Sequence, residues 1–437
     1  MTSLTVIAMM TACSSLGSSG SQPSGSTAVS TNLTTKPVTL HITMSVGNEA
    51  QYVQQTSAMF TKLHPNIKFD ITTQQFTSLV QNAQHLVTGS NIPDMIQLAN
   101  FGSLVKDKLL TNLDPYAKVY GWDKWDSGVF DGLRMSHNGT QLGSGSLYGI
   151  GHGSNITSVY YNKGIASKLG IESTPTTLND FVEDMQKAKA ANIVPLVVNG
   201  QDGLLTYPLQ NLAVAFEGSV AATQNWIYQK SGATIVNDYW VKAATTLQQW
   251  ANAGYLSPNT VSLNQTDAVN QFTDGQGLFY LTGDWSAPTF DASKTQTFGT
   301  FGFPPADKGG LIAAMTAQNI FSIPSGAAHP NEMAAYLNFI LTNAKARQLT
   351  YDLTGTVPPV VPGAPTLSID QNTAQAQAVK VYQQASKEGG LMGFMANATQ
   401  AMSTTLFPNT QLLVSNKLTP QQFVDQVQSD YESGLTK

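Results

Sequence analysis

The stretch VTLHITMSVGNEAQYVQQTSAMFTKLHPNIKFDI, residues 38–71, contains the pattern that decides the fold class. Apolar residues alternate along residues 38–44, as they do in a strand with one buried face. Four residues then recur at three- and four-residue spacing, which is typical of one helix face: Val53, Thr56, Phe60 and Leu63. Pro65 ends this pattern, and alternation resumes along residues 67–71. Strand, helix and strand in this order predict a right-handed α/β unit.

The same succession of elements continues along the chain. Further strands are expected at residues 94–98, 159–161 and 193–198. Pro195 predicts that the last of these lies at a sheet edge or has the proline at its start, because proline donates no ladder hydrogen bond. Start signals predict further helices that begin at Thr177, near Asn331 and at Thr419. The chain is therefore predicted to belong to the α/β class.

Composition narrows the classes of function. At 437 residues the chain is long enough for two or three domains. Lys and Arg number 22 against 27 Asp and Glu, and this net charge of -5 does not indicate a general nucleic-acid binder. A hydrophobic content of 41% with a mean hydropathy of -0.11 argues against a polytopic membrane protein. A single cysteine excludes an internal disulfide framework and a cysteine-rich metal site.

The N-terminal segment predicts secretion and anchoring. Residues 4–12 are mostly apolar but too short to span a bilayer, which suits a signal peptide. The sequence Met-Thr-Ala-Cys ending at Cys13 resembles a bacterial lipoprotein box, although no Lys or Arg precedes it. We therefore expect a signal and lipobox at 1–13, acylation of Cys13, and a disordered Ser/Thr/Gly-rich tether at 14–36. The alternative is a free cysteine in a disordered tail.

The sequence contains no familiar catalytic motif. None of the six histidines stands in an HExxH pair or beside a cysteine ligand, so a zinc site has little support. The chain has no G-x-S-x-G elbow and no Walker loop. Acidic residues are too sparse to indicate a carboxylate pair for glycoside hydrolysis. Adjacent tyrosines bind iron in some periplasmic binding proteins, but Tyr160 and Tyr161 are expected to pack in the core.

The composition combines aromatic rings with many neutral polar side chains. Aromatic residues make up 9% of the chain and charged residues only 11%. Aromatic faces stack on the apolar faces of sugar rings, while amides and hydroxyls bond to sugar hydroxyls. This composition is compatible with a saccharide pocket, although sequence alone does not separate cleft rings from core rings.

Several segments, in order, resemble the extracellular solute-binding proteins of ABC importers, the family that includes maltose-binding protein. The resemblance is carried by residues 58–69, 89–96, 147–163, 169–181, 272–285 and 330–339. The segment Leu-Tyr-Gly-Ile-Gly at 147–151, followed by Tyr-Tyr-Asn-Lys at 160–163, is similar to a crossing between lobes in that family. One departure is Gly151, which stands where the family usually has proline.

The resemblance implies a two-lobe periplasmic-binding-protein-like fold with a hinge and a ligand cleft between the lobes. It places the N-terminal lobe at 37–152 and 314–353, and the C-terminal lobe at 153–313 and 354–437. Carried over position by position, it implies these ligand-binding residues: Asn48, Glu49, Gln97, Asn100, Phe101, Asn155, Asp202, Tyr207, Asp284, Trp285 and Phe394.

The function implied by the resemblance is that of a monomeric receptor, lipid-anchored at the outer face of the cell membrane. It would capture a mono- or oligosaccharide and deliver it to the transmembrane subunits of an ABC permease, without a cofactor and without a reaction. Two alternatives stay open at this point. One is a secreted carbohydrate-active enzyme, and the other is the same fold with a peptide, polyamine or metal as its ligand.

Overall fold

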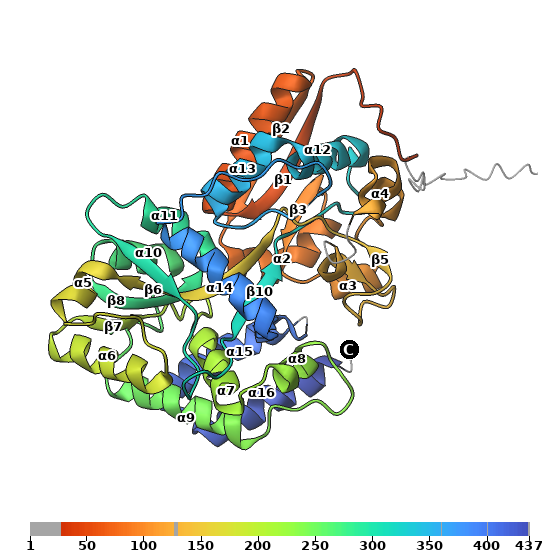
Figure 1. Ribbon diagram of the computed structural model, residues 1–437. Coiled ribbons are helices and arrows are strands. Elements are labelled where there is room, and N and C mark those ends of the chain that lie inside the picture. Colours follow the sequence, from red (N-terminus) through yellow and green to blue (C-terminus); the bar gives the residue numbers. More distant parts are fainter. Residues whose placement is uncertain (1–27, 126–129, 360, 400, 436–437) are drawn as a thin grey trace, which may run out of the picture.

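The computed structural model describes residues 28–125, 130–359, 361–399 and 401–435. Over these residues the chain forms two lobes, each built on its own sheet with helices packed around it (Figure 1). Buried apolar residues form separate clusters in the two lobes. The α/β class and the two-lobe architecture predicted from the sequence are therefore confirmed.

The first lobe contains a sheet in the order β11-β3-β1-β2. Its strands are β1 (Val38–Ser45), β2 (Ile67–Gln74), β3 (Met95–Leu98) and β11 (Ile320–Ser322). Strand β1 pairs in parallel with β2 and β3, whereas β11 is antiparallel to β3. Parallel strands end at the same edge of a sheet, so the residues that follow β1, β2 and β3 lie close together.

Helices cover the first-lobe sheet and fix its core. They are α1 (Asn48–Leu63), α2 (Phe76–Thr88), α3 (Gly102–Lys106), α4 (Asp114–Tyr120), α12 (Pro330–Thr342) and α13 (Ala344–Thr354). Short elements are η1 (Trp122–Lys124), η3 (Asp131–Leu133), β4 (Arg134–Met135) and β5 (Ser146–Leu147). Phe60 of α1 meets Tyr336 of α12 edge-on at 5.7 Å between ring centroids. Val53, Thr56 and Phe60 of the predicted helix face are buried, whereas Leu63, the last residue of the helix, is exposed.

The second lobe contains a mixed sheet in the order β12-β10-β6-β8-β7, with β9 also paired to β6. Its strands are β6 (Ser154–Asn162), β7 (Val194–Val197), β8 (Gly277–Gly283), β9 (Phe298–Phe301), β10 (Ala314–Gln318) and β12 (Leu391–Met392). Strand β7 pairs only with β8 among the named strands and so forms an edge of this sheet. Pro195 lies in it, as its missing N–H predicted.

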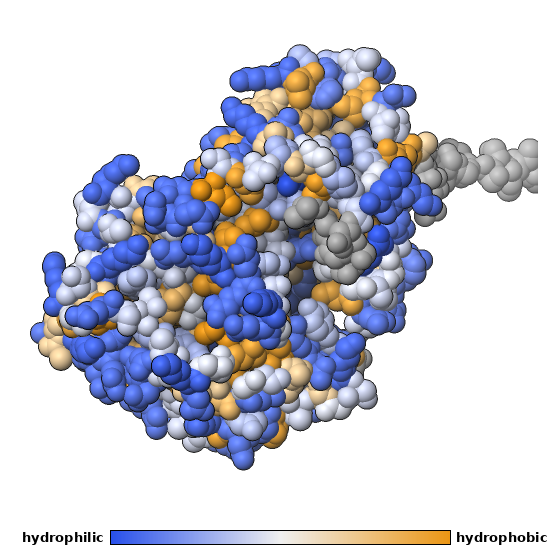
Figure 2. All heavy atoms as spheres, viewed as in Figure 1, coloured by the Kyte–Doolittle hydropathy of each residue, from blue (hydrophilic) through white to orange (hydrophobic). Residues whose placement is uncertain are grey.

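Helices surround the second-lobe sheet, and two of them begin at the predicted residues Thr177 and Thr419. They are α5 (Lys163–Lys168), α6 (Leu178–Ala190), α7 (Thr206–Glu217), α8 (Ala221–Ile227), α9 (Asp238–Asn252), α10 (Gln265–Thr273), α11 (Ala287–Asp291), α14 (Ala374–Glu388), α15 (Met402–Val414) and α16 (Pro420–Leu435). Short turns are η4 (Asp284–Ser286) and η5 (Met395–Asn397). Thr177 and Asp180 form the predicted capping box of α6. Hydrophilic residues cover much of this lobe's visible face (Figure 2).

Three chain segments cross between the lobes side by side. The backbone at Ile150 bridges to Phe321, and that at Ser154 bridges to Val357. A Cβ at Gly153 would overlap Thr356 and the carbonyl of Val357, so only glycine allows this close approach. The crossing predicted at residues 147–163 therefore lies against the segments near 320 and 356.

Two predicted boundaries are corrected by contacts in the structure, while the rest of the lobe division stays a prediction. Residues 314–318 were assigned to the first lobe, but as β10 they pair with β6 of the second sheet. Residues 28–36 were assigned to the disordered tether, but they are held on the first lobe. Leu33 packs on its core, and the Thr34 N–H donates to Glu332 at 3.0 Å. These long-range contacts leave no signal in a Ser/Thr-rich stretch.

Candidate cleft between the lobes

A cleft of about 470 Å³ lies between the lobes, within the usual size range of small-molecule sites. The first lobe contributes residues 45–49 at the end of β1, residues 75–77, 80 and 81 after β2, and residues 97–99 at the end of β3. The second lobe contributes residues that follow β7 and β8, together with parts of α10 and α15. Open α/β sheets generally bind ligands at these strand ends.

The first-lobe wall is a network of polar side chains around the start of α1. Gly47, at φ 117°, makes the turn that leads from β1 into this helix, and Asn48 and Glu49 follow in its first turn. Gln97 of β3 accepts hydrogen bonds from the Ser45 N–H at 2.9 Å and the Ser45 hydroxyl at 2.8 Å through Oε1. Its Nε2 group donates to Glu49. These bonds fix the polar wall before any ligand binds.

Trp285 is the principal ring of the second-lobe wall. It follows β8 in the turn η4, and a Cβ at Gly283 would overlap its ring, so the indole lies directly against the glycine backbone. The Trp285 carbonyl accepts a hydrogen bond from the Asn48 side chain at 2.9 Å. Because Asn48 belongs to the other lobe, this bond joins the two walls. The buried indole N–H has no hydrogen-bond partner among the described residues.

Further aromatic side chains extend the second-lobe wall. Tyr207, in the first turn of α7, lies 5.5 Å from Phe394 between ring centroids. Phe407 of α15 also lines the cleft, and it packs where a Cβ at Gly203 would otherwise lie. Burial, and then the charge of Asp202, raise the pKa of Tyr207, so this phenol stays neutral and acts as a hydrogen-bonding group.

The described lining of the cleft carries acidic charge and no basic charge. Its carboxylates are Glu49 and Asp202, and it contains no Lys, Arg or His. The Asp202 carboxylate accepts hydrogen bonds from the Asn199 side chain at 3.2 Å and from the backbone N–H of Gln265. Both acids are therefore already bonded to neutral donors. Such a site offers no counter-charge to an anionic ligand.

Eight of the predicted ligand-binding residues line this cleft: Asn48, Glu49, Gln97, Asn155, Asp202, Tyr207, Trp285 and Phe394. Asn100, Phe101 and Asp284 do not. Phe101 is 1% exposed and packs in the first-lobe core, because the chain turns inward there to begin α3. Asp284 is 3% exposed, and burial raises the pKa of its carboxyl well above the ordinary value. The prediction of Phe101 and Asp284 as contact residues is corrected on these grounds, whereas Asn100, which is partly exposed next to the cleft residue Ala99, stays a prediction.

Other cleft residues were missed. Phe76, which is 46% exposed, and Val80 come from α2, and Asn319 comes from a crossing segment. Phe76 follows the end of β2 as Asn48 follows β1, so the strand-end rule applied to every strand would have found it. Phe407 carries no such signal, because α15 lies about two hundred residues from the strand whose end it approaches.

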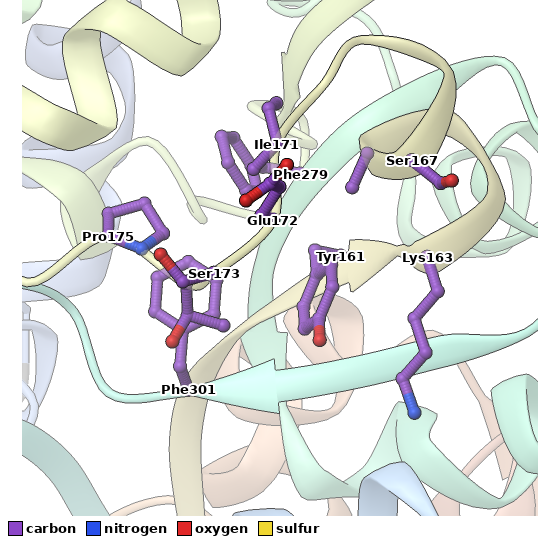
Figure 3. A pocket seen from close by; sticks show the side chains of 11 residues that line it. Tyr161, Lys163, Ser167, Ile171, Glu172, Ser173, Pro175, Phe279 and Phe301 are labelled. Atoms are coloured by element: carbon purple, nitrogen blue, oxygen red, sulfur yellow. The ribbon is translucent and has the colours of Figure 1, made fainter.

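Tyr160 and Tyr161 lie elsewhere. Tyr160 is fully buried, and Tyr161 lines a separate hollow of about 190 Å³ with Lys163 and Pro175 (Figure 3). Its floor is formed by Phe279 and Phe301, which belong to the second-lobe core. In the part of the chain that the structure describes, no group of His, Cys, Asp and Glu is arranged to hold a metal ion. The expectation of core packing is confirmed for Tyr160, whereas Tyr161 is only partly buried and lines this hollow.

Comparison with known proteins identifies the family. Residues 44–347 match the family described as bacterial extracellular solute-binding proteins, and this segment is more than half of the chain. The chain belongs to this family. In the described residues, no helix of this solute-binding protein has the length and apolar character needed to span a bilayer.

Its relatives include sugar-binding proteins. It is 25% identical to the "Multiple sugar-binding protein" of Streptococcus mutans over 48% of this chain and 50% of that protein. The chain spans about half the length of the curated sugar-binding relatives it matches.

Solved structures share the fold. A chitin oligosaccharide binding protein matches with a TM-score of 0.77 at 18% identity, covering 92% of this chain and 100% of the other. A maltose-bound protein of T. maritima matches with a TM-score of 0.72 at 16% identity, covering 90% and 99%. The two-lobe fold of this chain is thus shared with these two proteins.

Proposed function

We propose that this solute-binding protein captures a mono- or oligosaccharide in the interlobe cleft and presents it to an ABC importer. The observation that carries the proposal is the combination of aromatic rings with neutral and acidic polar side chains around one cleft. Rings of Tyr207, Trp285 and Phe394 line the second-lobe wall, and amides and a carboxylate around Asn48 and Gln97 line the first-lobe wall. Phe76 adds a ring to the first wall and Asp202 a carboxylate to the second. A sugar has an apolar C–H face and a rim of hydroxyls, which matches both kinds of group.

The charge of the cleft argues against anionic ligands. A polyamine would meet the carboxylates of Glu49 and Asp202, so polyamines belong in the ligand screen as the competing class. Phosphorylated or carboxylated ligands would find no basic side chain to pair with, and this favours neutral sugars over acidic ones. The names of the relatives point the same way, since they describe binding of multiple sugars, chitin oligosaccharide and maltose.

A saccharide screen tests this proposal. Thermal unfolding with a panel of neutral mono- and oligosaccharides, beside uronic-acid and phosphorylated sugars, should show stabilisation by neutral ligands only. A ligand at about 100 times its Kd adds about 2.7 kcal/mol to the free energy of unfolding. Calorimetric titration then gives Kd, and chromatography of the recovered ligand tests for turnover. Failure of every saccharide to stabilise the protein contradicts the proposal, and cleavage products would establish a carbohydrate-active enzyme instead.

We further propose that the protein is a monomer held at the outer face of the membrane by a lipid on Cys13, with permease transmembrane subunits as its partners. Cys13 and the tether at 14–27 lie outside the described residues, so the support is the sequence pattern alone. Cys13→Ser should release the protein into the medium, because stable anchoring of a polar segment needs acyl chains. Equal membrane retention of this variant and the wild type, measured by fractionation, would refute the anchor.

A further inference from the structure

The Glu49 carboxylate has two polar neighbours, Gln97 on one oxygen and His152 on the other. Its side chain is 11% exposed at the edge of the cleft. Gln97 approaches one carboxylate oxygen, and because the Gln97 Oε1 atom already accepts two hydrogen bonds from Ser45, its Nε2 group must point toward Glu49. The other oxygen, Oε1, lies 3.4 Å from Nε2 of His152.

His152 is placed to act only through Glu49. Its side chain is 0% exposed, and its ring lies between those of Tyr52, at 5.0 Å, and Phe321, at 5.1 Å between centroids. Neither ring nitrogen has a hydrogen bond of standard geometry among the described residues, and Glu49 is the ion-pair partner of Nε2. A contact between Nε2 and the Glu49 carboxylate calls for a proton on Nε2, because a carboxylate oxygen accepts hydrogen bonds.

The backbone at His152 belongs to the crossing between the lobes. Its neighbours Gly151 and Gly153 pack closely against Asn319 and Thr356 of the other two crossing segments. The histidine is therefore fixed by the hinge, while the carboxylate that it approaches faces the cleft. Nothing in the sequence pattern of residues 147–163 pointed to this contact, because Glu49 lies about a hundred residues earlier.

We infer that His152 is a positioning residue for ligand binding: from the interlobe crossing it holds the Glu49 carboxylate, together with Gln97, in the orientation that accepts hydroxyl protons of the ligand. The inference rests on the proposed saccharide function. The 3.4 Å separation is slightly longer than a standard hydrogen bond and lies within ion-pair distance. His152 never touches the ligand.

A double-mutant cycle tests this inference with the neutral saccharide that binds the wild type most tightly. His152→Phe keeps a ring between Tyr52 and Phe321 but removes the donor, and should weaken binding roughly tenfold, as for loss of one hydrogen bond to a charged group. His152→Gln, which keeps a donor, should recover most of that loss. In a Glu49→Gln background, His152→Phe should have little further effect. His85→Phe, on the exposed face of α2, is the matched control.

Additive losses in the cycle, or unchanged affinity in His152→Phe, would overturn the inference. A second measurement separates its failure from failure of the saccharide function. In the unliganded protein, nitrogen NMR of the His152 ring should show the Nε2–H tautomer, and Glu49→Gln should shift its signals. An Nδ1–H tautomer, or signals insensitive to Glu49→Gln, would overturn the pairing even where no saccharide binds. The unfolding midpoint of each variant establishes that it is folded.

Discussion

Replacement of Trp285 by alanine tests the aromatic wall of the cleft. The ring is half-buried on the backbone of Gly283, so one part of it is buried by the protein and the rest faces the cleft. The bond from Asn48 to the Trp285 carbonyl involves only the backbone of Trp285. Trp285→Ala therefore removes the ring and leaves the hydrogen bond between the lobes in place.

The expected loss follows from the area of the ring. A tryptophan side chain buries about 150–250 Å² when fully covered. At most about a third of this ring is exposed, which leaves roughly 50–80 Å² for the ligand, worth about 1.3–2 kcal/mol at about 25 cal/mol per Å². At about 1.4 kcal/mol per decade, Kd should rise roughly tenfold to thirtyfold. The part of the ring buried by the protein, roughly 100–170 Å², should contribute about 2.5–4 kcal/mol of stability.

Calorimetric titration beside a urea unfolding curve measures both quantities. The matched control is Trp125→Ala, since Trp125 is also half-buried, stacks on Phe130 at 5.7 Å, and does not line the cleft. This control should lose stability and keep its affinity. Unchanged affinity of Trp285→Ala together with a loss of about 3–5 kcal/mol would refute the reasoning and place Trp285 among the core residues.

Three further predictions concern the segments that cross between the lobes and the hydrogen bond that joins the cleft walls. Burial raises the pKa of Asp284, so the folded state binds more protons than the unfolded state above the ordinary Asp pKa of about 4, and stability should rise as pH falls from 7 toward 5. Asp284→Asn should flatten this rise in melting-temperature scans, and an unchanged slope would contradict the assignment. Gly355→Ala introduces a Cβ at φ 77° against the Asp284 carbonyl and should cost about 1–3 kcal/mol in urea unfolding, whereas a neutral result would show that the crossing adjusts freely. Asn48→Ala removes the bond between the lobes, so small-angle scattering should give a larger radius of gyration without ligand; an identical radius would show that this bond does not hold the lobes together.

Local patterns predicted the features that depend on residues near each other in the sequence. The alternation along residues 38–44 became β1, and the capping pair at Thr177 and Asp180 formed as expected. Pro195 was found at a sheet edge, because a missing N–H restricts a strand wherever it occurs. The family resemblance predicted part of the site as well, because eight of the ligand-binding residues that it implied line the cleft.

Only the tertiary structure decided which side chains face the cleft, because that depends on segments far apart in the chain. Asn48 and Trp285 are 237 positions apart and meet at 2.9 Å, so no local pattern encodes their contact. Phe101 follows a cleft strand but turns into the core, and Phe407 enters the cleft from a distant helix. In the sequence, His152 is a single histidine between two glycines. Its position next to Glu49 results from the packing of the segments that cross between the lobes. Periodicity and capping act over a few residues, whereas a binding site is formed by the packing of two lobes.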